Sequence, residues 1–197
     1  MNQLMRQKLF ITTSSRRPKG ALVSNMLRMD RLDSELISQL ERDARQGIGE
    51  LAERLGVSRN TVQSRLRRLT EAGLLQGFSP RLDLAAAGIS VEAFAALALE
   101  QGRLDETVQQ LSEMPEVMEI HTTTGREDLL VRLGAVSHAE LQESVQRILA
   151  LPAVGHSNTA LSLTTPLAYR VAPLLAKVTA DSGWGRSTAL PEQYRAD

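Results

Sequence analysis

The stretch that decides the fold is IGELAERLGVSRNTVQSRLRRL, which runs from residue 48 to residue 69. Ala52 lies four residues before Gly56, and Val62 lies six residues after it. A helix–turn–helix needs a small side chain where its two helices cross, a residue that tolerates a positive φ in the turn, and an aliphatic side chain that faces inward from the second helix. These three residues meet the three requirements in order. The spacing therefore predicts a helix–turn–helix.

Apolar residues around this stretch predict a domain of three short helices over residues 29–76. The first helix is expected to begin at Asp33, which can cap it, and the second to cover Ile48–Leu55. Ser58 is a good N-cap for the third helix, and Gly73 ends it. The inward-facing residues recur at helical spacing in each helix: Leu36, Ile37 and Leu40; Ile48, Leu51 and Leu55; Val62, Leu66 and Leu69.

The third of these helices has the composition of a DNA-recognition helix. Its residues 59–69 include four arginines and no acidic residue. Outward-facing residues near the start of such a helix contact base edges in the major groove, and basic residues further along hold phosphates. The alternative is a three-helix module that docks on another protein, with its arginines solvated. We expect Arg59, Asn60, Gln63 and Ser64 at base edges and Arg67 and Arg68 at phosphates, within a contact set of Ser58, Arg59, Asn60, Thr61, Gln63, Ser64, Arg67 and Arg68.

From Gly88 onward the pattern changes to strands that alternate with helices. Apolar positions between Leu104 and Val117 recur 37 residues later, each time as an amphipathic helix that runs into a proline and then a strand. The expected strands are Val91–Leu99, Val117–Thr124, Leu129–Gly134 and Val154–Thr164. This βαββαβ order predicts a ferredoxin-like domain. The fold class is therefore α+β, with an N-terminal helix–turn–helix domain and a C-terminal ferredoxin-like domain.

The helices of a ferredoxin-like domain cover only one face of its sheet, and the other face here is also apolar. Both alternating sets of side chains on Val91–Leu99 are apolar at the middle of the strand. The uncovered face therefore calls for a partner, which we expect to be a second copy of the chain. The alternative is a monomer in which the segment from Pro166 to Ala180 folds back over this face.

Charge is distributed unevenly along the chain. Residues 1–28 hold six basic residues and no acidic one, whereas residues 84–197 hold eight basic and fourteen acidic residues. Such polarity is typical of chains with a part that faces a polyanion, although a basic tail can also be merely solvated. The expected parts are a basic, disordered extension at 1–28, the helical domain at 29–76, a strand or linker at 77–88, the sheet domain at 89–166 and a partly helical tail at 167–197.

Composition excludes several classes of protein. Twenty-three basic residues balance twenty-three acidic ones, and the chain has no cysteine. A disulfide scaffold, a thiolate zinc site, an iron–sulfur cluster and a thiol nucleophile are therefore excluded. The longest apolar run, around residues 84–99, is interrupted by polar residues, and the N-terminus lacks the apolar core of a secretory signal. We expect a cytoplasmic protein with no membrane segment, no metal and no cofactor.

With these motifs the chain resembles the leucine-responsive regulatory protein/AsnC family of transcription regulators. In the first half the resemblance rests on Leu51-Ala52, Gly56-Val57-Ser58, Val62 and Arg65-Leu66-Arg67-Arg68-Leu69. In the second half it rests on Val117, His121 and Thr124-Gly125-Arg126-Glu127-Asp128-Leu129-Leu130. It covers roughly residues 30–165, with both domains in the family's order.

The resemblance implies a regulator that works as an oligomer. It implies homodimers that assemble into tetramers or octamers, bind and bend double-stranded DNA, and hold a small effector, usually an amino acid, between protomers near the Gly125–Asp128 turn. Two residues depart from the family pattern. Gly47 stands where a serine or threonine usually caps the second helix, and Glu127 stands where an aromatic residue is frequent.

The predicted turn offers polar groups that suit an amino acid. Gly125 lets the chain turn and exposes backbone N–H groups that can hold a carboxylate, and Asp128 can accept a hydrogen bond from an α-ammonium group. The alternative is a plain hairpin turn in which Asp128 caps backbone groups. The expected effector-binding residues are Thr122, Thr124, Gly125, Arg126, Glu127 and Asp128.

Catalysis finds little support in the sequence, and we expect no catalytic residue. The three histidines, His121, His138 and His156, are scattered without the spacing of a metal site. By resemblance alone, one enzymatic alternative is a tetrapyrrole decarboxylase of the same two-domain layout, which would use His121 and His156. The prediction is a sequence-specific DNA-binding regulator with an amino-acid effector. A second alternative is an architectural DNA-packing protein without an effector, because backbone-dominated binding needs no regulated pocket.

Overall fold

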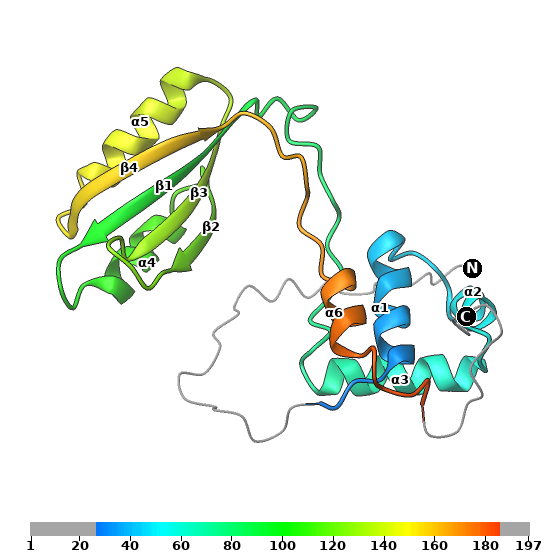
Figure 1. Cartoon of the computed structure of the whole chain (residues 1–197). Helices are drawn as coiled ribbons and strands as arrows, with labels where there is room; N and C mark the ends of the chain where they lie inside the picture. The colour runs from blue at the N-terminus through cyan, green and yellow to red at the C-terminus, as the bar shows by residue number, and fades with distance from the viewer. Residues whose placement is uncertain (1–26, 186–197) are drawn as a thin grey trace, which may run out of the picture. The chain divides into compact units, whose positions relative to one another are not determined.

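The computed structural model describes residues 27–185, which form two compact units. Of these residues, the first unit contains 27–77 and 171–185, and the second contains Phe78–Arg170 (Figure 1). The sequence predicts a basic extension over residues 1–28, and residues 1–26 of it lie outside the described residues. No helix in the described part of the chain is both long and apolar enough to cross a membrane.

The N-terminal unit contains the three predicted helices, α1 (Arg31–Arg42), α2 (Ile48–Leu55) and α3 (Arg59–Glu71). Gly56 ends α2 in the left-handed conformation, with φ of 65°, as the turn of a helix–turn–helix requires. Ala52 and Val62 are 5% and 2% exposed, so both face the core as predicted. The remaining core residues of the three helices are Leu32, Leu36, Leu40, Leu51, Leu55 and Leu69.

The start of α1 differs from the prediction. The N-cap is Asp30, whose carboxylate accepts a hydrogen bond from the Asp33 N–H at 3.0 Å. The Asp33 carboxylate in turn accepts one from the Asp30 N–H at 3.1 Å, which completes a capping box. Asp33 is therefore the third residue of the helix rather than its cap. The reciprocal pair satisfies two N–H groups, whereas the cap side chain alone would satisfy one.

The second unit is the predicted βαββαβ domain. Its four strands form one antiparallel sheet in the order β2-β3-β1-β4, so the two βαβ halves interleave as in a ferredoxin-like fold. The ferredoxin-like prediction is confirmed. The elements in chain order are β1 (Val91–Leu99), α4 (Leu104–Ser112), β2 (Val117–Thr122), β3 (Leu129–Ala135), α5 (His138–Leu149) and β4 (Val154–Ser162).

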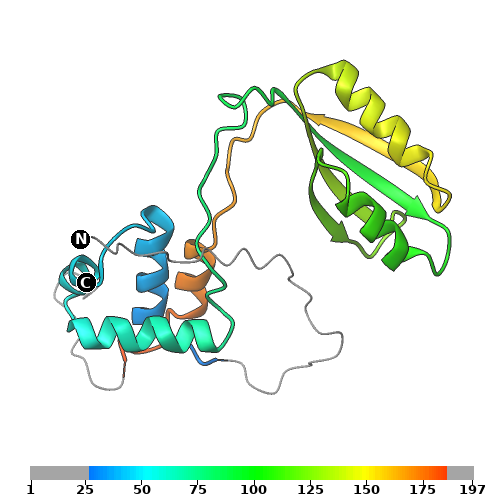
Figure 2. The same cartoon turned by 180° about the vertical axis from the view of Figure 1, so that it is seen from behind.

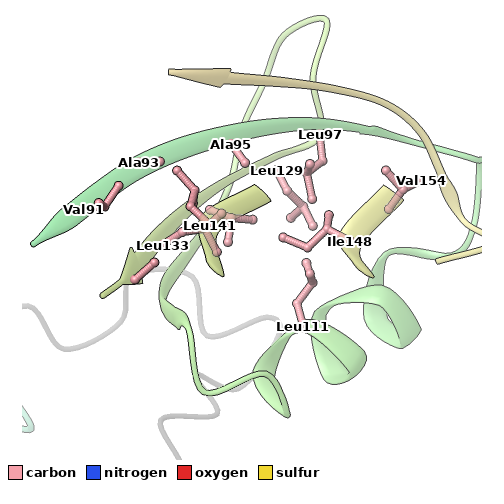
Figure 3. Packing of buried hydrophobic residues seen from close by; sticks show 12 residues of the cluster. Val91, Ala93, Ala95, Leu97, Leu111, Leu129, Leu133, Leu141, Ile148 and Val154 are labelled. Carbon is pink, nitrogen blue, oxygen red and sulfur yellow. The ribbon is translucent and has the colours of Figure 1, made fainter. Parts of the chain in front are cut away.

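Both helices of this unit lie on one face of the sheet (Figure 2), where alternate strand residues meet them. Leu97 of β1, Leu129 of β3, Leu111 of α4 and Ile148 of α5 are all fully buried in this core (Figure 3). On the opposite face Phe94 is 38% exposed, and no helix of the unit covers it.

The C-terminal segment does not cover that open face. Residues Ala172–Val178 form a helix, α6, which lies beside α1 in the N-terminal unit (Figure 1). Trp184 follows it and is 4% exposed within the core of the three helices. The alternative in which Pro166–Ala180 folds over the sheet is therefore wrong, because α6 packs beside α1 in the N-terminal unit. Leu174 and Val178 of α6 are themselves 60% and 69% exposed.

Candidate nucleic-acid interface and effector turn

The start of α3 is fixed by a side-chain cap. The Ser58 hydroxyl accepts a hydrogen bond from the Thr61 N–H at 3.1 Å, and the two hydroxyl groups lie 2.9 Å apart. This cap satisfies one of the N–H groups that a helix leaves unpaired at its start. Ser58 and Thr61 thus have structural partners within the predicted contact set.

The outward face of α3 contains most of the predicted contact residues. Val62 and Leu69 point into the core, and the residues between them on the other side of the helix are exposed. The Arg59 guanidinium lies against Gly49 of α2, where a Cβ would stand 3.3 Å from its Nη2 atom. The exposed predicted residues are Ser58, Arg59, Asn60, Gln63, Ser64 and Arg67, whereas Thr61 and Arg68 are half-buried.

A buried ion-pair cluster lies beneath this face. Asp33 of α1 is fully buried at its side chain, and its Oδ1 atom is 2.9 Å from Nη1 of Arg65. The same Arg65 nitrogen is 2.5 Å from Asp30 Oδ2, and Nη2 of Arg68 pairs with Asp33 Oδ2. Two arginines of α3 therefore hold two aspartates at the start of α1.

This cluster changes the expectation for Arg68. The sequence predicted a phosphate contact, but the Arg68 side chain is 40% exposed and is paired with the buried Asp33 carboxylate. Sequence reasoning missed Arg65 altogether. The available signal was its position, three residues after Val62 and four before Leu69, which places an arginine on the inward stripe. An arginine there requires an acidic partner.

The charges of the cluster stabilise one another. Burial by itself raises the pKa of Asp33, but hydrogen bonds from Arg68 and Arg65 outweigh burial and hold that pKa below its ordinary value. For Arg65, burial lowers the pKa, and the bonds from Asp30 and Asp33 outweigh it, so its pKa is raised. The cluster is thus ionised at neutral pH and joins α1 to α3 by charge-assisted hydrogen bonds.

The substitution Asp33→Asn should destabilise the N-terminal unit by about 3 kcal/mol at neutral pH, because it leaves two arginines facing a neutral amide in a buried site. Urea unfolding followed by Trp184 fluorescence measures this unit directly, since Trp184 is the single tryptophan and lies in its core. Asp43→Asn is the control, because the Asp43 side chain is 43% exposed and its ion pair is with Arg45, whose side chain is 92% exposed. If the two variants had the same free energy of unfolding, the proposed contribution of the ion-pair cluster to stability would be contradicted.

Acid should weaken the same unit. The folded pKa of Asp33 lies below the unfolded value of about 3.9, so its contribution is present above that pH and is lost as the pH falls through the folded pKa. We expect the unfolding free energy of the parent to decline below about pH 4 and that of Asp33→Asn to decline less. Parallel curves for the two proteins from pH 6 to pH 2.5 would show that Asp33 is not the responsible group.

The predicted effector residues lie in and beside the turn between β2 and β3. Thr122 is the last residue of β2 and pairs with Leu129 of β3, so β2 ends two residues earlier than predicted. Thr124, Gly125 and Arg126 are exposed. Gly125 has no positive φ, so the turn does not depend on a left-handed glycine at this position.

Asp128 anchors the turn to β1. Its N–H donates to the Leu97 carbonyl at 2.8 Å, and its Oδ2 atom accepts from the Leu99 N–H at 2.7 Å. The Thr123 hydroxyl donates to the Glu127 carbonyl, and the Thr123 N–H donates to the Asp128 carbonyl at 2.9 Å. Asp128 therefore caps the backbone, as the plain-turn alternative proposed, and only its other carboxylate oxygen can meet a ligand.

The two histidines of the enzymatic alternative lie far from each other in the sheet. His121 is on β2, opposite Leu130, and His156 is on β4, opposite Ala98. These are the two edge strands, separated by β3 and β1. Among the described residues, no group of three or more metal-ligating side chains could hold a metal ion.

Comparison with known proteins identifies both units. Residues 29–70 match the profile of the AsnC-type helix-turn-helix domain, and residues 92–171 match that of the Lrp/AsnC ligand binding domain. The chain belongs to the Lrp/AsnC family. It is a transcriptional regulator with a helix–turn–helix domain and a ligand-binding domain, and its relatives are regulators rather than enzymes.

Individual relatives of this Lrp/AsnC protein agree with the assignment. The chain is 28% identical over 137 residues to the HTH-type transcriptional regulator FL11 of Pyrococcus horikoshii, covering 70% of this chain and 91% of the relative. It is 34% identical over 121 residues to the transcriptional regulator LrpA of Mycobacterium tuberculosis, covering 61% and 81%. A solved feast or famine regulatory protein of M. tuberculosis, complexed with L-methionine, has a TM-score of 0.67 at 31% identity and covers 73% of this chain and 97% of that protein.

Proposed function

We propose that this Lrp/AsnC regulator binds specific sites on double-stranded DNA through the exposed face of α3, as a homo-oligomer whose second unit takes an amino acid as effector. The observation that carries the DNA proposal is the division of the arginines of α3. Arg65 and Arg68 are neutralised by buried aspartates, while Arg59 and Arg67 are exposed on a helix without acidic residues before Glu71. The exposed charge therefore lies on the same face as the polar side chains that would read bases.

The Arg67→Ala variant tests this interface. If Arg67 holds one phosphate, the variant should bind every duplex more weakly, and the slope of log K against log salt should fall by about one unit. Arg42→Ala is the matched control, since Arg42 is an exposed arginine of the same unit that lies on α1. Fluorescence anisotropy across a salt series measures both quantities. Loss of affinity for the target site alone, with an unchanged slope, would instead place Arg67 at a base edge.

An amino acid fits the turn between β2 and β3. Exposed backbone at 124–126 offers N–H groups to a carboxylate, and the remaining oxygen of Asp128 offers an acceptor to an ammonium group. Support comes from the related solved regulator that is complexed with L-methionine. Because Asp128 also anchors β1, the informative change is Asp128→Asn, which keeps an oxygen for the Leu99 N–H and removes the charge.

Asp128→Asn should bind DNA as tightly as the parent and should lose any change in affinity that an amino acid produces. The measurement is a mobility-shift titration against DNA from upstream of the protein's own gene, with each of the twenty amino acids and with L-methionine first. A variant that responds like the parent would place the effector elsewhere. Binding by the parent that no amino acid alters would favour the DNA-packing alternative.

The open face of the sheet supports self-association. Phe94 lies on this face between Arg132 of β3 and Ala160 of β4, and Met118 of β2 is 37% exposed beside Gly134. A second copy of the same face would cover these side chains from water.

The substitution Phe94→Asp should therefore lower the mass of the assembly in solution, because it places a charge where two apolar faces would meet. Leu104→Asp is a closely matched control: Leu104 is 37% exposed, against 38% for Phe94, but begins α4. Light scattering after size-exclusion chromatography gives the masses. A Phe94→Asp protein with the mass of the parent would show that the oligomer uses another surface.

A further inference from the structure

The chain carries a C-terminal arm, residues 171–185, which completes the N-terminal unit. Residues beyond 171 lie outside both family matches, yet the arm packs within the unit that holds the helix–turn–helix. Figure 1 shows α6 beside α1, and the segment after α6 reaches the start of α1, where the Arg31 N–H donates to the Gly183 carbonyl. The DNA-binding unit is thus built from two pieces of chain that are separated by the whole sheet domain.

Polar contacts fix both ends of the arm on α1. The two carboxylate oxygens of Glu41 accept hydrogen bonds from the N–H groups of Val171 and Ala172, at 2.9 and 3.1 Å. At the other end the Arg31 N–H donates to the Gly183 carbonyl at 3.2 Å. The arm therefore spans α1 from its last turn to its first residue.

The last part of the arm covers the ion-pair cluster. Trp184 is buried in the same core as Leu32 and Leu69, which come from α1 and α3. Gly185 lies so close to Arg65 that a Cβ there would stand 2.5 Å from its Nη2 atom. Arg65 is consequently only 16% exposed, and shielding from water strengthens its bonds to the two aspartates.

The arm also reaches the face that we propose for DNA. An open pocket of about 700 Å³ lies beside the contact between the arm and Arg65, and its lining includes Ser64 of α3 and Asp181 and Ser182 of the arm. Ser64 is one of the side chains proposed to contact base edges. A displaced arm would therefore expose Arg65 to water and change the surroundings of Ser64 at the same time.

We propose that the C-terminal arm is a positioning element for DNA recognition: by covering Arg65 and bridging α1 to α3, it sets the placement of the recognition helix. This inference rests on the proposed function. Sequence-independent affinity depends on charge, whereas specific affinity depends on how α3 sits in the groove. We therefore expect the affinity for a specific site to exceed the sequence-independent affinity only while the arm is docked.

The test is Glu41→Gln in the full chain. Each carboxylate oxygen of Glu41 accepts a hydrogen bond from one arm N–H group, Val171 or Ala172, so the glutamine keeps an acceptor for one of them and places an amide NH₂ against the other. Glu53→Gln makes the same charge change at an exposed residue of α2 in the same unit. Docking is read from iodide quenching of Trp184, the single tryptophan. Affinity is measured for a duplex that the parent binds specifically and for a shuffled duplex of equal length, at a temperature where circular dichroism shows both variants folded.

We expect Glu41→Gln to increase quenching of Trp184 and to lower specific affinity about tenfold, the loss that corresponds to one charge-assisted hydrogen bond. The affinity of Glu41→Gln for the shuffled duplex should not fall. Glu53→Gln should match the parent in quenching of Trp184 and in the ratio of specific to shuffled affinity, because the loss of one negative charge acts on both affinities alike. A second pair, Trp184→Ala and Trp184→Phe, should repeat the pattern in the two affinities, with loss of specific affinity in the first and rescue in the second.

Three results would overturn the inference. An equal fall in both affinities would mean that the arm only stabilises the fold, since partial unfolding removes all binding alike. Unchanged specific affinity in Glu41→Gln and in Trp184→Ala would mean that the arm has no part in recognition. Failure of the parent to bind any duplex at low salt would reject the proposed function itself, and quenching of Trp184 in the parent would then still show whether the arm is docked.

Discussion

The interaction on which the DNA-binding unit depends is the bonding of one buried carboxylate, that of Asp33, by two arginines of the neighbouring helix. Three short helices bury too little apolar surface to fix their angles by packing alone. The bonds from Arg65 and Arg68 add direction, because a guanidinium and a carboxylate meet in few orientations. The capping box with Asp30 holds the carboxylate in place from its own helix. The position of α3, and hence of its exposed face, follows from this cluster.

Each of the two units contains one of the two domains of the regulator, the helix–turn–helix domain or the ligand-binding domain. One presents the exposed face of α3, which has no acidic residue before Glu71. The other presents a sheet with one uncovered apolar face and a polar turn anchored by Asp128. The chain leaves the first unit after Gly77 and returns to it at Val171, so the sheet domain is inserted within the DNA-binding unit. Both ends of the sheet domain are therefore joined to the helical unit, covalently to α3 through Gly77 and by the hydrogen bonds of the docked arm to α1.

Much of this architecture could be predicted because it is encoded locally. The spacing of Ala52, Gly56 and Val62 specifies the helix–turn–helix, and the 37-residue repeat specifies the two βαβ halves. The features that were not predicted depend on contacts between residues that are distant in the chain. Asp33 was predicted to be a cap because its bonds to α3 span more than thirty residues, and the docking of Trp184 on α1 has no periodic signal at all. The roles of the exposed α3 residues stay predictions, since they concern a partner outside the chain.

The most direct test of the central claim is selection from a random duplex library by the parent protein and by Gln63→Ala. Gln63 is exposed on α3 between the ion-pair cluster and the N-terminal turn, where a side chain of a recognition helix meets base edges. We expect the parent to enrich one DNA motif. Gln63→Ala should enrich the same motif without a base preference at one or two of its positions. The absence of any enriched motif, or identical motifs for both proteins, would contradict recognition through this face of α3.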